Sequence, residues 1–386
     1  MAALSSGHLA TDLAQGSLPA FLPFLVERFS LTYTMAAGLV LAATLSSSVV
    51  QPAFGLWSDA RGALWLLPTG VALAGVGMAL LAVAPSYPLA FAAVLAAGLG
   101  VAAFHPEGSK FAVFVSGERR ASGMSLFSLG GNVGFALGPV AASGAMLALG
   151  FRGGLLVALP GLAVAAMLLA RRRYLAGFAP APGMGARSGQ EPDQPRALAL
   201  LIAVIGLRSV AHMGLFTFVP LWEVAKGNSK GYGTVLLSLF LIAGAVGTLA
   251  GGPLADRFGR RPVMLCTYVA SVPLIVAYVL VGGMLGAAAV ILAGAAIISS
   301  FSVSLVLSQE YLPRRVGMAS GLSVGLAIGL GGVAAVVLGA VADAIDLRTA
   351  VLFTASGPAL GALLILLLPR ARRRRVVEPA AAATTT

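Results

Sequence analysis

Long apolar stretches recur along the whole chain and are separated by short polar or basic turns. Each stretch has about the 20 apolar residues that a helix needs to cross the hydrocarbon core of a bilayer. The pattern therefore predicts about twelve transmembrane helices. Their expected ranges are 4–28, 36–57, 63–84, 88–114, 121–148, 153–170, 197–222, 233–254, 263–282, 285–308, 316–342 and 348–368.

The composition agrees with a membrane protein. Of the 386 residues, 59% are hydrophobic and only 10% are charged, whereas soluble domains have roughly 25% charged residues. The 49 glycines suit membrane helices, in which small residues let two backbones pack closely. The net charge is +12, but the basic residues lie in short loops and in the tail, so we expect no nucleic-acid partner. The single cysteine, Cys266, cannot form an intrachain disulfide.

One long connection divides the expected helices into two sets of six. It is rich in Arg, Pro, Gly and Ser, a composition that is typical of a linker. We expect an N-terminal six-helix bundle at 1–170, a linker at 171–196 and a C-terminal six-helix bundle at 197–368. The remaining residues, 369–386, are expected to form a basic, disordered tail.

The basic residues also predict how the chain is oriented, because cytoplasmic loops carry an excess of Lys and Arg. If the N-terminus is cytoplasmic, the cytoplasmic side receives most of the arginines, including 171–173 and the cluster at 370–375. We therefore expect both termini and the linker to be cytoplasmic. The other side then receives only Arg28, Arg152, Lys226, Lys230 and Arg348.

The two sets of six helices resemble each other in sequence. Arg119 and Arg120 precede the fifth expected helix, Arg314 and Arg315 precede the eleventh, and similar small residues follow each pair. His8 and Asp12, four residues apart in the first helix, correspond to a basic pair with the same spacing in the seventh. Two parallel repeats with a cavity between them describe a transporter that works by alternating access.

A loop that occurs in both halves resembles the signature of the major facilitator superfamily. Its complete form is 252–261, and a first copy at 55–62 departs from it because Ala60 separates the acid from the arginine. Three further segments resemble fosmidomycin-resistance-type transporters, namely 7–12, 104–110 and 125–139. The resemblance implies an all-α major facilitator fold of two pseudo-symmetric bundles in a bacterial inner membrane. The chain begins close to His8, so we expect a short cytoplasmic end of the first helix.

Four ionisable residues lie inside apolar stretches of the N-terminal half: His8, Asp12, His105 and Glu107. A charge at the centre of a membrane helix is costly, so such residues usually face a bundle interior or a wet cavity. Residues four apart share a helix face, which places His8 beside Asp12. We expect all four to take part in proton coupling. The alternative is a structural lock between the first and fourth helices, such as Glu107 paired with Lys110.

Arg208 and His212 are the corresponding pair in the seventh helix. A guanidinium stays protonated and offers a planar fork that matches a carboxylate or a phosphonate. We expect this pair to bind substrate, while the alternatives are a structural counter-ion or an arginine that reaches the membrane surface. Asn132 in the fifth helix and Gln51 in the second are further candidates for hydrogen bonds to substrate.

Two further sets of residues are candidates for the transport motion. In the signature loops, an acid at the membrane edge can cap a neighbouring helix or pair with arginine, which would hold one side closed; the alternative is a topology anchor. The candidate gating residues are Asp59, Arg61, Asp256, Arg257, Arg260 and Arg261. In the fifth helix, small residues on one face precede a proline and resemble an antiporter motif, with plain packing as the alternative. These candidate hinge residues are Gly130, Gly134, Gly138 and Pro139.

These features favour a secondary active transporter, specifically a proton-coupled antiporter for efflux of small drug-like or anionic compounds and hence for drug resistance. The alternatives are a proton-linked importer of a small metabolite, a non-transporting receptor, or an intramembrane enzyme that uses His105 and Glu107. No phosphate-binding loop is present, and the spacing in His-Pro-Glu does not match a metal motif. We therefore expect no enzyme activity, cofactor or metal. The expected partners are a small-molecule substrate, protons and the lipid bilayer, for a protein that is a monomer.

Overall fold

A computed structural model describes residues 1–61, 63–117, 120–178, 192–314 and 316–369. Within these ranges the chain is almost entirely helical and contains no strand. The N-terminal half consists of α1 (Ala2–Gly16), α2 (Leu18–Phe29), α3 (Tyr33–Ser48), α4 (Gln51–Arg61), α5 (Leu66–Ala79), η1 (Leu80–Ala82), α6 (Tyr87–Ser116), α7 (Arg120–Leu149), η2 (Phe151–Val157), α8 (Ala158–Ala170) and α9 (Arg172–Ala176).

The C-terminal half has longer uninterrupted helices. They are α10 (Pro195–Ala225), α11 (Lys230–Phe258), α12 (Arg260–Val281), α13 (Gly283–Tyr311), α14 (Val316–Ala344), α15 (Leu347–Phe353) and α16 (Ser356–Ile365). Part of the expected linker is helical, since α9 lies in it and α10 begins at its end. The boundaries expected for the domains stay predictions, and the tail from 370 onward lies outside the described residues.

The described helices account for the expected transmembrane segments. Ten are long and apolar enough to cross a membrane, and two shorter apolar helices, Leu66–Ala82 and Ile328–Ala344, complete the set among the described residues. Each overlaps one of the ranges expected from the sequence. The prediction of about twelve membrane helices in an all-α fold is therefore confirmed.

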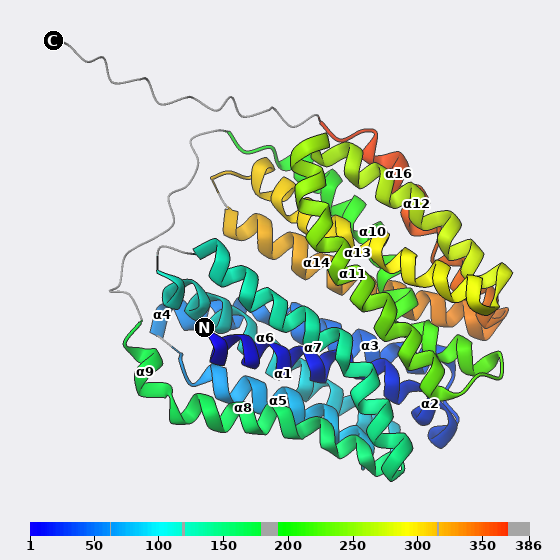
Figure 1. Cartoon of the computed structure of the whole chain (residues 1–386), viewed down its shortest axis with the longest axis horizontal. Coiled ribbons are helices and arrows are strands. Elements are labelled where there is room, and N and C mark those ends of the chain that lie inside the picture. The colour runs from blue at the N-terminus through cyan, green and yellow to red at the C-terminus, as the bar shows by residue number, and fades with distance from the viewer. Residues whose placement is uncertain (62, 118–119, 179–191, 315, 370–386) are drawn as a thin grey trace.

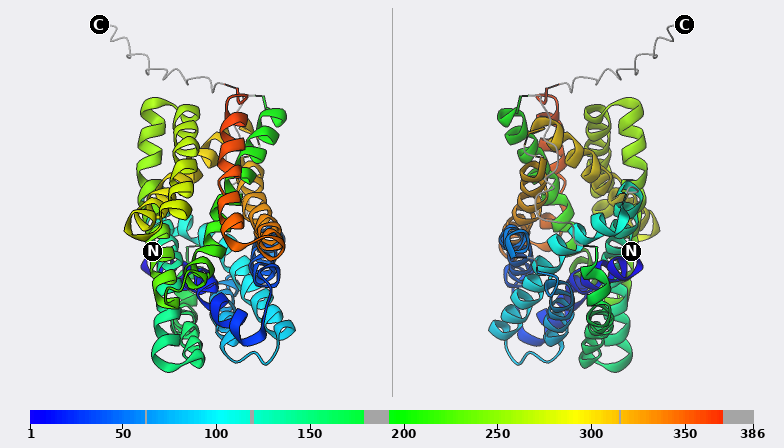
Figure 2. Two further views of the ribbon diagram at one scale, coloured as in Figure 1. Left: turned by 90° about the vertical axis from the view of Figure 1, so that its right-hand side faces the viewer. Right: turned by 90° about the vertical axis from the view of Figure 1, so that its left-hand side faces the viewer.

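The helices form two bundles that lie against each other, with blue-to-green helices in one and green-to-red helices in the other (Figures 1 and 2). Each span crosses the molecule once, so their ends alternate. The end that carries Met1, α9 and the start of α10 is called the linker end here. The other end carries the turns after α2 and α10 and the end of α14, and is called the opposite end.

Helix caps at the opposite end fix where three spans begin. Thr32 accepts a hydrogen bond from the Met35 amide at 3.2 Å at the start of α3, and Ser229 accepts one from the Tyr232 amide at 3.1 Å at the start of α11. Asp346 accepts one from the Thr349 amide at 2.6 Å at the start of α15. Such caps satisfy amide groups that have no partner within the helix. The Thr349 amide also holds the pKa of the Asp346 carboxyl below its usual value.

The hydrogen bonds and ion pairs that join the two halves, among the described residues, lie at the opposite end. The Asp343 carboxylate on α14 accepts hydrogen bonds from the Tyr33 and Thr34 amides at 2.7 and 2.9 Å, and from the Thr34 hydroxyl at 2.6 Å. Asp343 therefore caps the N-terminus of α3 from the other half. Nearby, Lys230 of α11 forms an ion pair with Glu27 of α2. These contacts hold the two halves together at this end.

Helices α1 and α7 pack so closely that glycine is required along their contact. A Cβ atom on Gly130, Gly134 or Gly138 of α7 would lie only 2.4, 2.1 or 2.5 Å from a backbone oxygen of α1. From the α1 side, a Cβ on Gly16 would lie 2.3 Å from the Phe135 oxygen. In a bilayer, such close backbone contact replaces the hydrophobic force that joins helices in water. We call this contact, formed by Gly16, Gly130, Gly134 and Gly138, the glycine seam.

Candidate functional site

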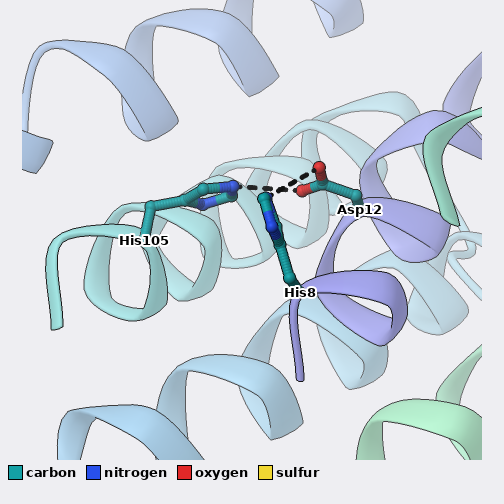
Figure 3. A group of neighbouring side chains, drawn as sticks. All are labelled: His8, Asp12 and His105. Carbon is teal, nitrogen blue, oxygen red and sulfur yellow. Dashed lines mark ion pairs between the residues drawn. The ribbon is translucent and has the colours of Figure 1, made fainter. Parts of the chain in front are cut away.

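His8, Asp12 and His105 meet in the N-terminal half (Figure 3). His8 and Asp12 lie one turn apart on α1, and their Nε2 and Oδ2 atoms are 3.2 Å apart. His105 reaches from α6 and places its Nε2 atom 3.1 Å from Asp12 Oδ1. The side chains are mostly buried, with exposed fractions of 12%, 14% and 22% for His8, Asp12 and His105. We call these three residues the carboxylate–histidine cluster.

Backbone carbonyl groups determine where the protons of this cluster lie. The Nδ1 atom of His8 is 2.8 Å from the Phe127 oxygen, and that of His105 is 2.9 Å from the Val101 oxygen. A carbonyl oxygen only accepts hydrogen bonds, so each Nδ1 carries a proton. Each Nε2 then makes an attractive contact with Asp12 either as a protonated donor to the carboxylate or as an acceptor from a protonated carboxyl. The geometry therefore suits two histidines that share protons with one carboxylate.

The residues packed around the cluster leave little space for a larger side chain. The His8 ring stacks on Phe127 with 4.2 Å between ring centroids. Gly131 of α7 lies directly over the cluster, because a Cβ atom there would be 2.4 Å from His8 Nε2 and 2.7 Å from Asp12 Oδ2. The ligating atoms of the three side chains lie within 4.8 Å of one another. That spacing would also accommodate a metal ion, so the experiment below includes a chelator.

Glu107 has a different partner from His105, although only Pro106 separates them. Its side chain is 1% exposed, and Oε2 lies 3.5 Å from the Nζ atom of Lys110 on the same helix. Two residues along a helix point to different faces, which explains why the two side chains diverge. The structure thus shows the Glu107–Lys110 pair that the locking alternative named. The role of Glu107 in proton coupling stays a prediction.

Arg208 and His212 are buried in α10 with few polar partners. Arg208 is 3% exposed and forms no hydrogen bond or ion pair with another described residue, and its Nε atom is buried. Its guanidinium lies over the Phe301 ring of α13, with 5.2 Å from Cζ to the ring centroid. The Nε2 atom of His212 is also buried and unpartnered, and the ring lies near Phe240. This pair can therefore donate hydrogen bonds to a ligand.

The two remaining substrate candidates are less buried. Asn132 is exposed on α7, and Gln51 is partly exposed at the start of α4. No hydrogen bond joins either side chain to another described residue. Their role in substrate binding stays a prediction.

The described gating candidates do not join the two halves in this conformation. Asp256 and Arg257 are exposed at the linker end. Arg260 pairs with Glu310 of α13 at 2.6 Å, and Arg261 donates to the Leu366 carbonyl at the end of α16. The side chains of Asp59 and Arg61 lie outside the described residues.

The candidate hinge glycines belong to the glycine seam and face α1 of their own half. Close packing therefore accounts for Gly130, Gly134 and Gly138 without a hinge. Pro139 lies within α7, which continues to Leu149. A hinge role for these residues stays a prediction.

A further buried carboxylate was not expected from the sequence. Glu223 of α10 is 1% exposed and accepts hydrogen bonds from Lys226 at 2.7 Å, Asn228 at 2.6 Å and the Tyr278 hydroxyl at 2.8 Å. The spacing of Glu223 and Lys226, three residues apart on a helix, was a visible signal for pairing. These partners satisfy the carboxylate and connect α10 to α12. The network therefore stabilises the packing of these two helices. Asp343 and Gly131 were missed as well.

Curated relatives and a family model extend these observations. The model described as Major Facilitator Superfamily matches residues 4–335 and, in a second alignment, 228–385. The chain is 34% identical over 376 residues to an uncharacterized MFS-type transporter, YfnC, of Bacillus subtilis strain 168, covering 93% of this chain and 90% of that protein. It is also 34% identical over 377 residues to the fosmidomycin resistance protein of Escherichia coli strain K12, covering 95% and 91%. The resemblance expected from the sequence is confirmed.

Solved transporter structures share the fold. A bacterial homologue of the human lysosomal transporter Spinster, in an inward-facing and occupied conformation, is 15% identical, aligns over 96% of both chains and gives a TM-score of 0.79. The nucleoside transporter NupG is 15% identical over 95% of this chain and 98% of its own, with a TM-score of 0.72. The relatives, the family match and the shared fold place this chain in the major facilitator superfamily, as a multi-pass membrane transporter rather than an enzyme.

Proposed function

We propose that the chain is a proton-coupled exporter of small anionic or drug-like compounds that works by alternating access. The observation that carries the proposal is the contact of two histidines from different helices with Asp12. A carboxylate and two imidazoles in contact can hold or release protons while the site stays compact. Buried ionisable groups inside membrane helices commonly form proton relays.

Arg208 and His212 form the substrate pole in this proposal. A buried guanidinium without an acidic partner favours an anionic ligand, since the ligand would supply the missing counter-charge. The fosmidomycin resistance protein of Escherichia coli supports export, because resistance to a compound fits its removal from the cell. Fosmidomycin is therefore a reasonable first substrate to test.

In alternating access, the two ends of the transporter close in turn. In the proposed orientation the linker end is cytoplasmic, so the conformation described here is held together on the periplasmic side by Asp343 and Lys230. Asp256 and Arg257 would hold the cytoplasmic side closed in the other conformation. Asp256→Asn should then lower turnover a few-fold without affecting membrane insertion. Unchanged transport by folded Asp256→Asn protein at saturating substrate would contradict this gating role.

The central test uses purified protein in liposomes, with two activities measured on one preparation. An imposed pH gradient drives accumulation of fosmidomycin, while exchange of labelled for unlabelled fosmidomycin needs no net proton transfer. Asp12→Asn should reduce gradient-driven accumulation at least about tenfold and preserve exchange, because an amide cannot carry the titrating proton. Glu107→Gln serves as a second carboxylate variant and tests the prediction made for Glu107.

Three outcomes would argue against the proposal. Gradient-driven transport at the wild-type rate in Asp12→Asn protein would remove the cluster from coupling. Loss of both activities in a folded variant would indicate a structural role. If a chelator abolished transport by the wild-type protein, a metal ion rather than shared protons would account for the cluster.

A further inference from the structure

A groove of about 270 Å³ opens on the N-terminal half at the linker end. It lies where α5 begins and α8 ends, beside the short helix α9. Its lining residues are Leu64, Trp65, Pro68, Leu169, Arg172, Arg173 and Ala176. Apart from the two arginines, the lining is apolar.

The groove crosses the expected surface of the membrane. The apolar helix that contains α5 begins at Leu66, and the span that contains α8 ends at Ala170. Pro68 and Leu169 therefore belong to apolar spans, whereas Arg172 and Arg173 follow the end of one of them. Trp65, which is 51% exposed, lies at the boundary, where indole rings are enriched in membrane proteins.

Both arginines are available to a ligand. Their side chains are exposed, and neither forms an ion pair or a hydrogen bond with another described residue. A guanidinium fork suits the oxygen atoms of a phosphate group. Basic residues directly beside a membrane span attract anionic lipids.

An arginine of the C-terminal half lies near the pseudo-equivalent position. There α12 begins and α16 ends, as α5 and α8 do in the other half. Arg261 at the start of α12 donates a hydrogen bond to the Leu366 carbonyl at the end of α16. That arginine binds the end of a helix, which Arg172 and Arg173 do not do among the described residues.

We propose that this groove binds one anionic phospholipid. An acyl chain lies against Leu64, Pro68 and Leu169, and the phosphate lies between Arg172 and Arg173. This combination of an apolar groove with basic residues at one end matches a phospholipid better than a free anion, which has no use for the apolar part. The site is independent of the transport cycle proposed above.

The test uses the full-length protein in mild detergent and phosphatidylglycerol with brominated acyl chains, because bromine quenches nearby tryptophan. The brominated lipid should quench wild-type fluorescence at least five times more strongly than brominated phosphatidylcholine at equal concentration. Trp65→Phe should reduce the extra quenching, and Trp57, whose ring centroid lies 5.5 Å from that of Trp65, accounts for the remainder. Arg172→Gln with Arg173→Gln should abolish the preference. The charge-matched control is Arg152→Gln with Arg348→Gln, which changes two exposed arginines at the opposite end. This control should retain the preference for phosphatidylglycerol.

Two further arms separate the groove from simple charge attraction. Ala176→Phe keeps both arginines and fills the groove, so it should weaken quenching about as much as the arginine pair does. Millimolar inorganic phosphate should not compete. The proposal is overturned if Ala176→Phe protein, folded by thermal unfolding, binds like wild type, if phosphate competes fully, or if the two lipids quench equally.

Discussion

The two halves of the molecule carry related polar pairs that differ in the partners around them. On α1, His8 and Asp12 are joined by His105, and both oxygens of Asp12 lie close to an imidazole nitrogen. On α10, Arg208 and His212 each retain a buried nitrogen with no partner. The sequence repeat places the two pairs in equivalent helices, so the difference lies in what the neighbouring helices supply.

Under the proposed function, this difference corresponds to a division of roles. The carboxylate–histidine cluster combines one acidic group with two basic groups, so it can gain or lose a proton without leaving a large uncompensated charge. Arg208 has only the face of Phe301, a cation–π contact that compensates part of its burial. An unpaired buried charge has a high free-energy cost. An anionic substrate would therefore reduce this cost at Arg208, which has no counter-charge, more than at Asp12.

The largest expected effect tests this division at Arg208. Arg208→Gln should weaken binding of anionic substrate roughly 10- to 100-fold, as expected from the loss of a charge-assisted hydrogen bond. Proton uptake by the substrate-free protein should remain, because the cluster is in the other half. Equilibrium binding and proton uptake measured on the same detergent-solubilised protein would show both. If proton uptake fell together with substrate binding, the separation of roles would be wrong.

A substitution at Gly131 tests whether the cluster depends on its close packing. Gly131→Ala would place a methyl group against His8 Nε2 and Asp12 Oδ2, so coupled transport should fall about tenfold while Arg208 stays intact. Gly144→Ala is the matched control, because a Cβ at that position on the same helix meets no atom within 4 Å. Equal activities of the two variants in the liposome assay would contradict the importance of this contact.

The smallest expected effect concerns the contact that joins the two halves at the opposite end. Asp343→Asn removes the charge that caps α3 from the other half and should shift the conformational equilibrium a few-fold toward opening of the opposite end. Asp346→Asn is the control, since Asp346 caps α15 in its own half. Labelling rates of a cysteine introduced at Thr44, measured on a Cys266→Ala background, would report the opening. Equal rates in both variants would show that Asp343 does not stabilise this end.

The sequence predicted the spans well because apolar length is a local property that does not depend on partners. It also placed His8 beside Asp12, since a spacing of four residues fixes a shared helix face. It did not predict that His105 would join Asp12, because that contact depends on how α1 and α6 approach each other. The requirement for glycine at position 131 could not be predicted for the same reason. In the sequence, Gly131 cannot be distinguished from the other small residues of the helix.

The glycine candidates show the limit of motif reasoning most clearly. Gly130, Gly134 and Gly138 were candidates for a hinge, with plain packing as the alternative, and they contact α1 of their own half. A pattern of small residues predicts a close helix contact but does not name the partner helix. Asp343 was missed because its role arises only when α14 of one half meets the start of α3 in the other.

The glycine seam ends near the middle of the first span, which runs without interruption from Ala2 to Phe29. Gly138 lies against Leu13 and Ser17, and Ser17 lies between α1 and α2 with a helical backbone conformation. The portion of the span with the carboxylate–histidine cluster is thus fastened to α7, while Glu27, which pairs with Lys230, lies beyond Ser17. One helical span, Ala2–Phe29, therefore connects the carboxylate–histidine cluster to the contact that joins the two halves.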